Sequence, residues 1–251
     1  MFPPDSPLVA DVLPAPNHEA RRHGVRPDLL LLHYTGMTTG PAALERLTSP
    51  NHSVSSHYFV DLDGRILQLV AERERAWHAG QAVWAGETDI NSCSIGIEIV
   101  NPGHDYGYPD FPPAQVDAVI ALCRDIVTRN AIAPARVLAH SDVAPGRKQD
   151  PGEKFPWARL AAAGVGLWFD PVPVREGPVL APGDQGVAVT ELQAALADVG
   201  YGIKATGAYD DATRDVVMAF QRHFRPALVD GRADISTIET LQQFSAIATP
   251  P

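Results

Sequence analysis

The chain has 251 residues, of which 45% are hydrophobic and 20% are charged, and its formal net charge is −10. This composition predicts a soluble, packed protein with room for one full domain and a smaller second one. The acidic balance argues against a nucleic-acid-binding protein, whose contact face is basic. No apolar run approaches the roughly 18 residues of a membrane span.

The first elements in chain order are short strands and one helix. Residues 29–32 form a continuous apolar run, which predicts a strand in a sheet covered on both faces. A helix is expected to start near Pro41, with Leu44 and Leu47 on one face. The Asp63–Gly64 pair then predicts the turn of a hairpin.

The next elements complete an α/β pattern. Residues 94–100 alternate, which places three isoleucines on one face of a strand and Glu98 on the other. Apolar residues at helical spacing predict a helix over 113–130, and residues 137–139 predict a further strand end. Strands that alternate with helices indicate an α/β fold with a mixed central β-sheet flanked by helices.

The chain divides after this pattern. We expect a first domain over residues 1–170, a Pro-rich linker over 171–183 and a small all-α domain of three helices over 184–251. Asp211 and Asp234 are expected to cap two of these helices. Two cysteines are too few for a disulfide framework, so both are expected to be core residues.

Three residues at the ends of the predicted strands offer a metal site. His33 ends the apolar run, His140 begins a loop directly after residues 137–139, and Asp150 follows in the same loop. Two imidazoles and one carboxylate are a ligand set of catalytic zinc that leaves a position for water. Taken singly, each residue could equally be a hydrogen-bonded structural group.

Two further residues would complete a hydrolytic mechanism. Glu98 faces away from the isoleucines, and a general base must take a proton from the zinc-activated water. Lys148 could stabilise negative charge on the attacked carbonyl oxygen. The alternatives are a buried ion pair for Glu98 and a surface ion pair for Lys148.

A second group of polar and aromatic residues could contact a substrate. Trp and His side chains can line a sugar or peptide groove, and an Arg fork can bind a carboxylate. Burial in the core, a plain turn or a solvated charge is the competing interpretation for each. The residues are Tyr34, His57, Trp77, His78, Asn101 and Arg147.

These motifs together resemble a known family. His33-Tyr-Thr, Ser94-Ile-Gly-Ile-Glu98 and the long segment His140-Ser-Asp-Val-Ala-Pro-Gly-Arg-Lys-Gln-Asp-Pro-Gly152 occur in the order seen in type 2 N-acetylmuramoyl-L-alanine amidases of the AmpD- and AmiD-like branch. The C-terminal part is similar to the peptidoglycan-binding module of some members.

The resemblance implies an activity and assigns roles. It implies hydrolysis of the amide between the lactyl group of (anhydro-)N-acetylmuramic acid and the L-Ala of the stem peptide, with muropeptides as partners. It matches the zinc ligands to His33, His140 and Asp150, the base to Glu98 and the oxyanion-stabilising residue to Lys148. A non-catalytic peptidoglycan-recognition module is the alternative.

The expected compartment follows from the amino terminus. No signal peptide or lipobox is visible there, which favours a cytoplasmic role in peptidoglycan recycling. An exported amidase that acts on intact cell wall is the alternative. No obligate protein partner is evident from the sequence.

Overall fold

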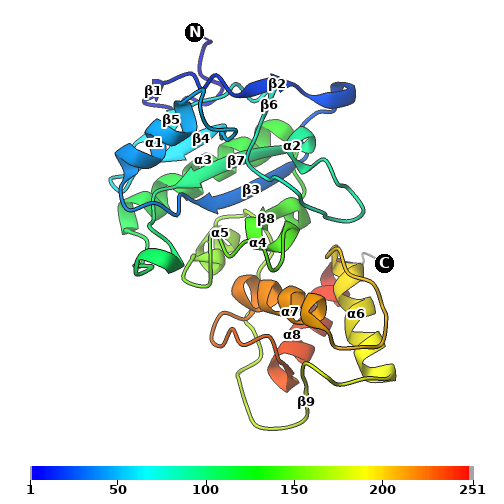
Figure 1. The fold of residues 1–251 in the computed structure, drawn as a ribbon. Helices are drawn as coiled ribbons and strands as arrows, with labels where there is room; N and C mark the ends of the chain where they lie inside the picture. Colours follow the sequence, from blue (N-terminus) through cyan, green and yellow to red (C-terminus); the bar gives the residue numbers. More distant parts are fainter. Residues whose placement is uncertain (1, 249–251) are drawn as a thin grey trace.

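The computed structural model describes residues 2–248. A six-stranded mixed sheet lies at the centre of residues 2–170, which we call the α/β region (Figure 1). Its strands run in the order β1, β5, β4, β7, β3, β8, and only the β4–β5 pair is antiparallel. Their bounds are Asp11–Val12 (β1), Leu29–Tyr34 (β3), Tyr58–Val60 (β4), Ile66–Gln68 (β5), Ser94–Ile99 (β7) and Val137–Ala139 (β8).

Strand β3 is the apolar run predicted to be covered on both faces, and this prediction is confirmed. Leu29 and Leu31 pack into one apolar cluster, whereas Leu30 and Leu32 pack into another on the opposite face. Strand β3 pairs in parallel with β7 and with β8. In this register Leu32 lies beside Ile97, and His33 lies beside Glu98.

Helices cover both faces of the sheet. Helix α3 (Pro113–Asn130) packs on the face that carries the three isoleucines of β7, and its bounds are those predicted. Helix α1 (Gly40–Thr48) begins after Thr39, whose hydroxyl accepts a hydrogen bond from the Ala42 N–H. The remaining helices of this region are α2 (Ile90–Cys93), α4 (His140–Val143) and α5 (Trp157–Ala162).

Smaller elements complete the α/β region. Strand β2 (His18–Ala20) pairs with β6 (Glu74–Ala76) as a separate two-stranded sheet. Short 3-10 turns occupy Arg22–Gly24, His104–Tyr106 and Pro134–Arg136. The predicted hairpin is confirmed, since β4 and β5 flank the Asp63–Gly64 turn.

Residues 184–248, which we call the C-terminal helical region, contain helices α6 (Val187–Val199), α7 (Asp211–Phe224) and α8 (Ile235–Ala248). The sequence pattern missed a two-stranded sheet, in which β9 (Val179–Leu180), within the predicted linker, pairs with β10 (Ala233–Asp234). Asp234 accepts from the Thr237 N–H as predicted. The cap of α7 is Asp210 rather than Asp211, because Asp210 accepts from the Thr213 N–H.

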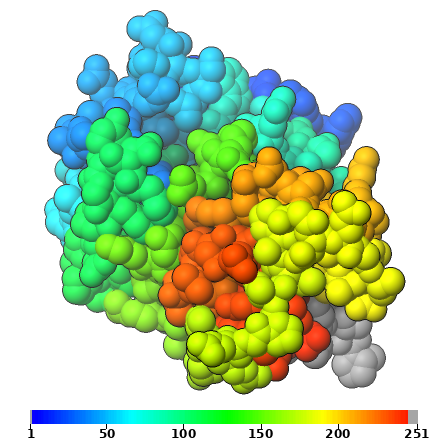
Figure 2. All heavy atoms as spheres, turned by 60° about the horizontal axis from the view of Figure 1, so that its bottom comes forward, coloured from blue at the N-terminus to red at the C-terminus, as the bar shows by residue number. Residues whose placement is uncertain are grey.

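The C-terminal helical region shares an apolar core with the sheet. Leu29 and Leu31 of β3 belong to the same buried cluster as Leu196 of α6 and Phe220 of α7. Figure 2 shows α7, in orange, packed closely against green segments of the α/β region, with α6, in yellow, beside α7. No helix among residues 2–248 is both long enough and apolar enough to cross a bilayer.

Candidate catalytic metal centre

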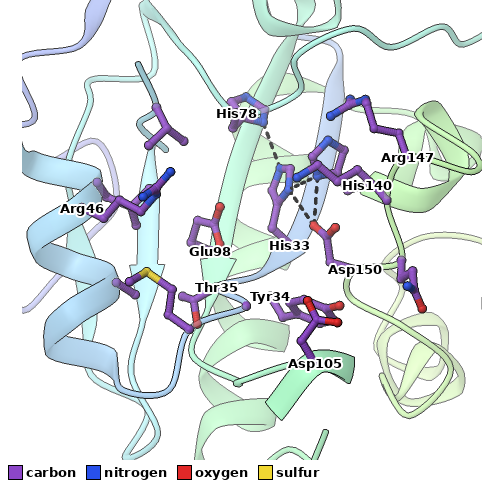
Figure 3. A pocket seen from close by; sticks show the side chains of 17 residues that line it. His33, Tyr34, Thr35, Arg46, His78, Glu98, Asp105, His140, Arg147 and Asp150 are labelled. Atoms are coloured by element: carbon purple, nitrogen blue, oxygen red, sulfur yellow. Dashed lines mark hydrogen bonds and ion pairs between the residues drawn. The ribbon is translucent and has the colours of Figure 1, made fainter. Parts of the chain in front are cut away.

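Three side chains meet at the carboxyl ends of the central strands, where α/β sheets build their sites. His33 comes from the end of β3, His140 from the first residue of α4 after β8, and Asp150 from the following loop. His33 Nδ1 and His140 Nδ1 lie 2.9 Å apart, and each lies 3.0 Å from Asp150 Oδ2 (Figure 3). The three residues form a group that could hold a metal ion.

The spacing and chemistry of this group fit zinc. Tetrahedral zinc with bonds of about 2.0–2.1 Å places neighbouring ligand atoms about 3.3–3.4 Å apart. The observed spacings of 2.9–3.0 Å are only a few tenths of an ångström shorter. Imidazole nitrogen is a borderline donor and carboxylate oxygen a hard one, and zinc accepts both in its catalytic sites.

In His33 and His140, a hydrogen bond donated by Nε2–H leaves Nδ1, the nitrogen that faces the triad, with a free lone pair. His140 Nε2–H donates to the Ala79 carbonyl at 3.0 Å, which leaves Nδ1 unprotonated. His33 Nε2–H donates to His78 Nδ1 at 3.0 Å, so His78 must carry its own proton on Nε2. That proton points to Ser94 Oγ at 3.3 Å, and Ser94 donates in turn to the Ile90 carbonyl.

The buried positions of these groups also set their charge. Burial, followed by the neighbouring His140, lowers the pKa of His33 to about 4. Burial by itself would raise the pKa of the Asp150 carboxyl, but interactions with His140 and His33 hold that pKa well below its usual range. A neutral His33 and an ionised Asp150 are therefore present at neutral pH, as metal ligation requires.

Glu98 lies beside the triad on β7. The residue is half-buried, and no group among residues 2–244 hydrogen-bonds its buried Oε2. Burial, followed by the charge of Asp150, raises the pKa of Glu98 well above its usual range, while Lys148 opposes the rise. An unpaired carboxyl of raised pKa at the edge of a cleft is suited to exchange a proton.

The cleft in front of the triad has a volume of about 370 Å³. Of the residues predicted from the sequence, His33, Tyr34, His78, Glu98, His140, Arg147, Lys148 and Asp150 line it. Lys148 is partly buried, and no side-chain hydrogen bond among the described residues engages its ammonium. Arg147, in contrast, donates to the carbonyls of Ala79 and Gln81 and so anchors that loop.

Three of the residues predicted to contact a substrate lie outside the cleft lining. His57 is fully buried, its Nδ1 accepts from the Gly96 N–H, and burial lowers its pKa to about 3. Trp77 directly follows β6, and its backbone N–H donates to Ser55 Oγ. Asn101 is buried in a turn and donates to the Pro109 carbonyl.

The cleft also contains polar residues that the sequence did not suggest. Arg46 enters it from α1 and Asp105 from the turn after β7 (Figure 3). Gln149 precedes Asp150 in residues 140–153, which we call the metal loop. In this view Glu98 lies between Arg46 and His33. Helical spacing had placed Arg46 on a helix, but nothing in the spacing showed that this side of the helix faces the cleft.

Comparison with known families gives matches for both parts of the chain. Residues 23–153 match the family described as N-acetylmuramoyl-L-alanine amidase. Residues 185–241 match a family described as "Putative peptidoglycan binding domain". The chain is 41% identical over 221 residues to the N-acetylmuramoyl-L-alanine amidase AmiD of Escherichia coli K12, a match that covers 83% of this chain and 79% of that protein.

Solved structures show the same likeness. A complex of E. coli AmiD with anhydro-N-acetylmuramic acid-L-Ala-D-γ-Glu-L-Lys superposes with a TM-score of 0.77 at 38% identity, and the match covers 91% of this chain and 92% of that one. AmpDh3 of Pseudomonas aeruginosa in complex with anhydromuramic pentapeptide superposes with a TM-score of 0.72 at 34% identity, covering 88% of this chain and 92% of that one.

Proposed function

Because this chain belongs to the N-acetylmuramoyl-L-alanine amidase family, we propose that its cleft holds one catalytic zinc ion and cleaves anhydro-muropeptides. Membership of this family gives the amidase activity, whereas the zinc ion and the anhydro-muropeptide substrate are what we propose. The bond is the amide between the lactyl group of N-acetylmuramic acid and L-Ala. The observation that carries the zinc proposal is the convergence of His33, His140 and Asp150, with ligand atoms 2.9–3.0 Å apart.

The protein's own residues supply the proton transfers and the charge stabilisation. When bound, zinc would acidify a water and polarise the scissile carbonyl. Glu98 accepts the proton of the attacking water at its carboxylate and then delivers a proton to the departing L-Ala nitrogen. Lys148 borders the same cleft, where its ammonium stabilises the charge that develops on the carbonyl oxygen.

Local cations support an anionic, peptide-bearing substrate. The chain as a whole carries a formal charge of −10, so its overall field repels the carboxylates of a stem peptide. Arg46, Arg147 and Lys148 all border the cleft and provide a local positive field. The anhydro-muropeptide complexes of the two related structures support the same substrate class.

A direct assay tests the metal and the substrate together. The metal-free protein, prepared with a chelator, is incubated with anhydromuramoyl tripeptide with and without one equivalent of zinc, and the products are separated by mass. We expect anhydromuramic acid and free tripeptide only in the zinc-loaded sample. The His140→Ala variant is the matched control, because two remaining ligands hold zinc poorly. Absence of product after zinc loading would overturn the proposal.

We propose the cytoplasm as the compartment, with recycling of muropeptides as the role. Cys93 and Cys123 are both free buried thiols, which is the usual state in a reducing compartment. Fractionation of the source cells, with detection of the untagged protein, tests this. Recovery with the envelope, together with activity on intact sacculi, would favour the exported alternative instead.

A further inference from the structure

Asp142 connects the metal loop to the C-terminal helical region. It lies two residues after His140 on the one-turn helix α4, and its side chain is completely buried. Its Oδ2 accepts from the Ala139 N–H at 2.8 Å and so fixes the backbone at the start of α4, where His140 is carried. A buried carboxylate needs donors for its remaining lone pairs.

Those donors come from the second region of the chain. The Tyr201 hydroxyl, just after α6, donates to Asp142 Oδ1 at 2.8 Å, and His223 Nδ1–H of α7 donates to Asp142 Oδ2 at 2.6 Å. Tyr201 and His223 are themselves almost fully buried. The Tyr201 ring packs edge-on against Trp84, and the His223 ring stacks on Trp157 at 3.7 Å, so both donors are fixed in place.

Helix α7, which carries His223, also contacts the other end of the metal loop. Arg222, next to His223, donates to Gln149 Oε1 at 3.3 Å and lies 3.9 Å from a Glu153 oxygen. These two residues flank Asp150, the third ligand of the triad. Between the two ends, a Cβ on Gly146 would lie only 2.2 Å from the carboxylate of Asp215 on α7, so helix and loop touch there as well. Figure 1 shows α7 beside α4.

We propose that Tyr201 and His223 are positioning residues, through which the C-terminal helical region holds His140 in the geometry that binds the metal. The region would then raise zinc affinity whether or not it also contacts glycan. The inference rests on the zinc centre proposed above. Tyr201 and His223 act on His140 through Asp142 and α4, and neither of them lines the cleft.

The chain offers variants that separate the hydrogen bonds from general stability. Tyr201→Phe removes only a hydroxyl. His223→Phe keeps a stacked ring without the donor, whereas His223→Asn keeps a donor close to the position of Nδ1 without the ring. Tyr209→Phe is the matched control, because the Tyr209 hydroxyl is a buried donor in the same region that bonds to the Gly231 carbonyl and not to Asp142.

The measurement is the zinc dissociation constant of each full-length variant, obtained by competition with a chromophoric chelator. Circular dichroism of the metal-free proteins first verifies that each is folded. Loss of the partners that orient a ligand typically costs about 10- to 100-fold in metal affinity. We expect the Tyr201→Phe/His223→Phe double variant to fall in the lower part of that range, His223→Asn to retain more affinity than His223→Phe, and Tyr209→Phe to match the parent.

Two results would overturn the inference. A double variant with the zinc affinity of Tyr209→Phe shows that the contacts stabilise the fold without positioning His140. A parent protein that binds no zinc removes the metal centre itself and the inference with it. The first result leaves the proposed function intact, so the two failures are distinguishable. If the double variant does not fold, the isosteric Tyr201→Phe variant decides alone. Weaker zinc binding than in Tyr209→Phe supports the inference, and equal zinc binding overturns it.

Discussion

At the scale of single residues, Glu98 combines a reactive position with an unfavourable environment. It is half-buried near Asp150, and its buried Oε2 has no hydrogen-bond partner among the residues whose side chains are described. A residue that only stabilised the fold would be paired or replaced by an apolar one. The arrangement is therefore best explained by proton transfer, and two separate measurements test it.

The first prediction concerns turnover. Glu98→Gln should lower kcat by about 100- to 10,000-fold, the usual contribution of general acid–base catalysis. Zinc content should remain one per chain, because Glu98 is not part of the ligand triad. Steady-state assays and metal analysis of the same sample measure both. Loss of zinc in this variant would assign Glu98 to the ligands instead.

The second prediction concerns stability and pH in the metal-free protein. The pKa of Glu98 is raised by folding, so the folded state keeps a proton that the unfolded state releases as pH rises above the usual value. This contribution is fully present below the unfolded pKa and is lost as pH rises through the folded pKa. Metal-free Glu98→Gln should thus be more stable than the parent at about pH 7, with the gap closing towards about pH 4. Urea titrations across this range measure it, and a constant gap would contradict the pKa shift.

At the scale of elements, strand β7 makes room for the histidine that orients His33. Gly96 faces His78, and a Cβ at this position would lie 2.6 Å from His78 Nδ1. That nitrogen is the acceptor for His33 Nε2–H. The absence of a side chain at position 96 therefore leaves the space in which His78 can orient His33.

The third prediction is that Gly96→Ala displaces His78 and weakens zinc binding by about 10- to 100-fold. Chelator competition measures the affinity. Gly107→Ala is a control for the substitution itself, because no atom lies within 4 Å of a Cβ there, although its φ of +92° adds some strain. Equal zinc affinity in the Gly96→Ala variant and the parent would show that His33 needs no partner at Nε2.

Elements with a strong pattern could be predicted from the sequence, and those set by packing could not. The bounds of α3 were predicted because apolar spacing extends over its whole length. The start of β3 was predicted because its apolar run over 29–32 is unbroken, although the strand continues to Tyr34. Strands β9 and β10 have two residues each, which is too short for any periodicity. They form because the packing of Leu180 of β9 against the apolar cluster that contains Ala233 of β10 brings the two segments side by side.

The same distinction applies to the site. The ligand triad was predictable because His33 lies near the end of β3 and His140 directly follows β8, and a parallel sheet brings these strand ends to one edge. His57 was not, since its motif does not reveal that the ring faces the buried Gly96 amide rather than the cleft. Asp142 belongs to a motif that was noted, but its partners Tyr201 and His223 lie about 60 and 80 residues further along the chain and have no local signal.

At the scale of the whole molecule, one apolar cluster joins the sheet to the C-terminal helices. Residues from β3, from the loop around Trp84 and from α6 and α7 all contribute to it. Two parts of a chain that share a core of this kind should unfold together. The two regions are therefore expected to behave as one cooperative unit.

The fourth prediction tests this cooperativity. Phe220 of α7 is fully buried, so Phe220→Ala should cost about 3–5 kcal/mol. Trp84 and Trp157 contact Tyr201 and His223 of the C-terminal helical region, so the fluorescence is recorded in a background in which Trp84, Trp157 and Trp168 are replaced by Phe and only Trp77 of the α/β region remains. The fluorescence transition in urea should shift together with the loss of helical circular dichroism. A fluorescence midpoint that stays at the parental value would show that the regions unfold independently.

The register between β3 and β7 has one more consequence. His33 faces Glu98 across that strand pair, and the neighbours of Glu98 on either side are isoleucines. A slip by a single residue turns every side chain of a strand to its opposite face, which would put an isoleucine where the base should be. In a refolded sample, the specific activity therefore measures the fraction of molecules in which β3 and β7 have paired in the native register.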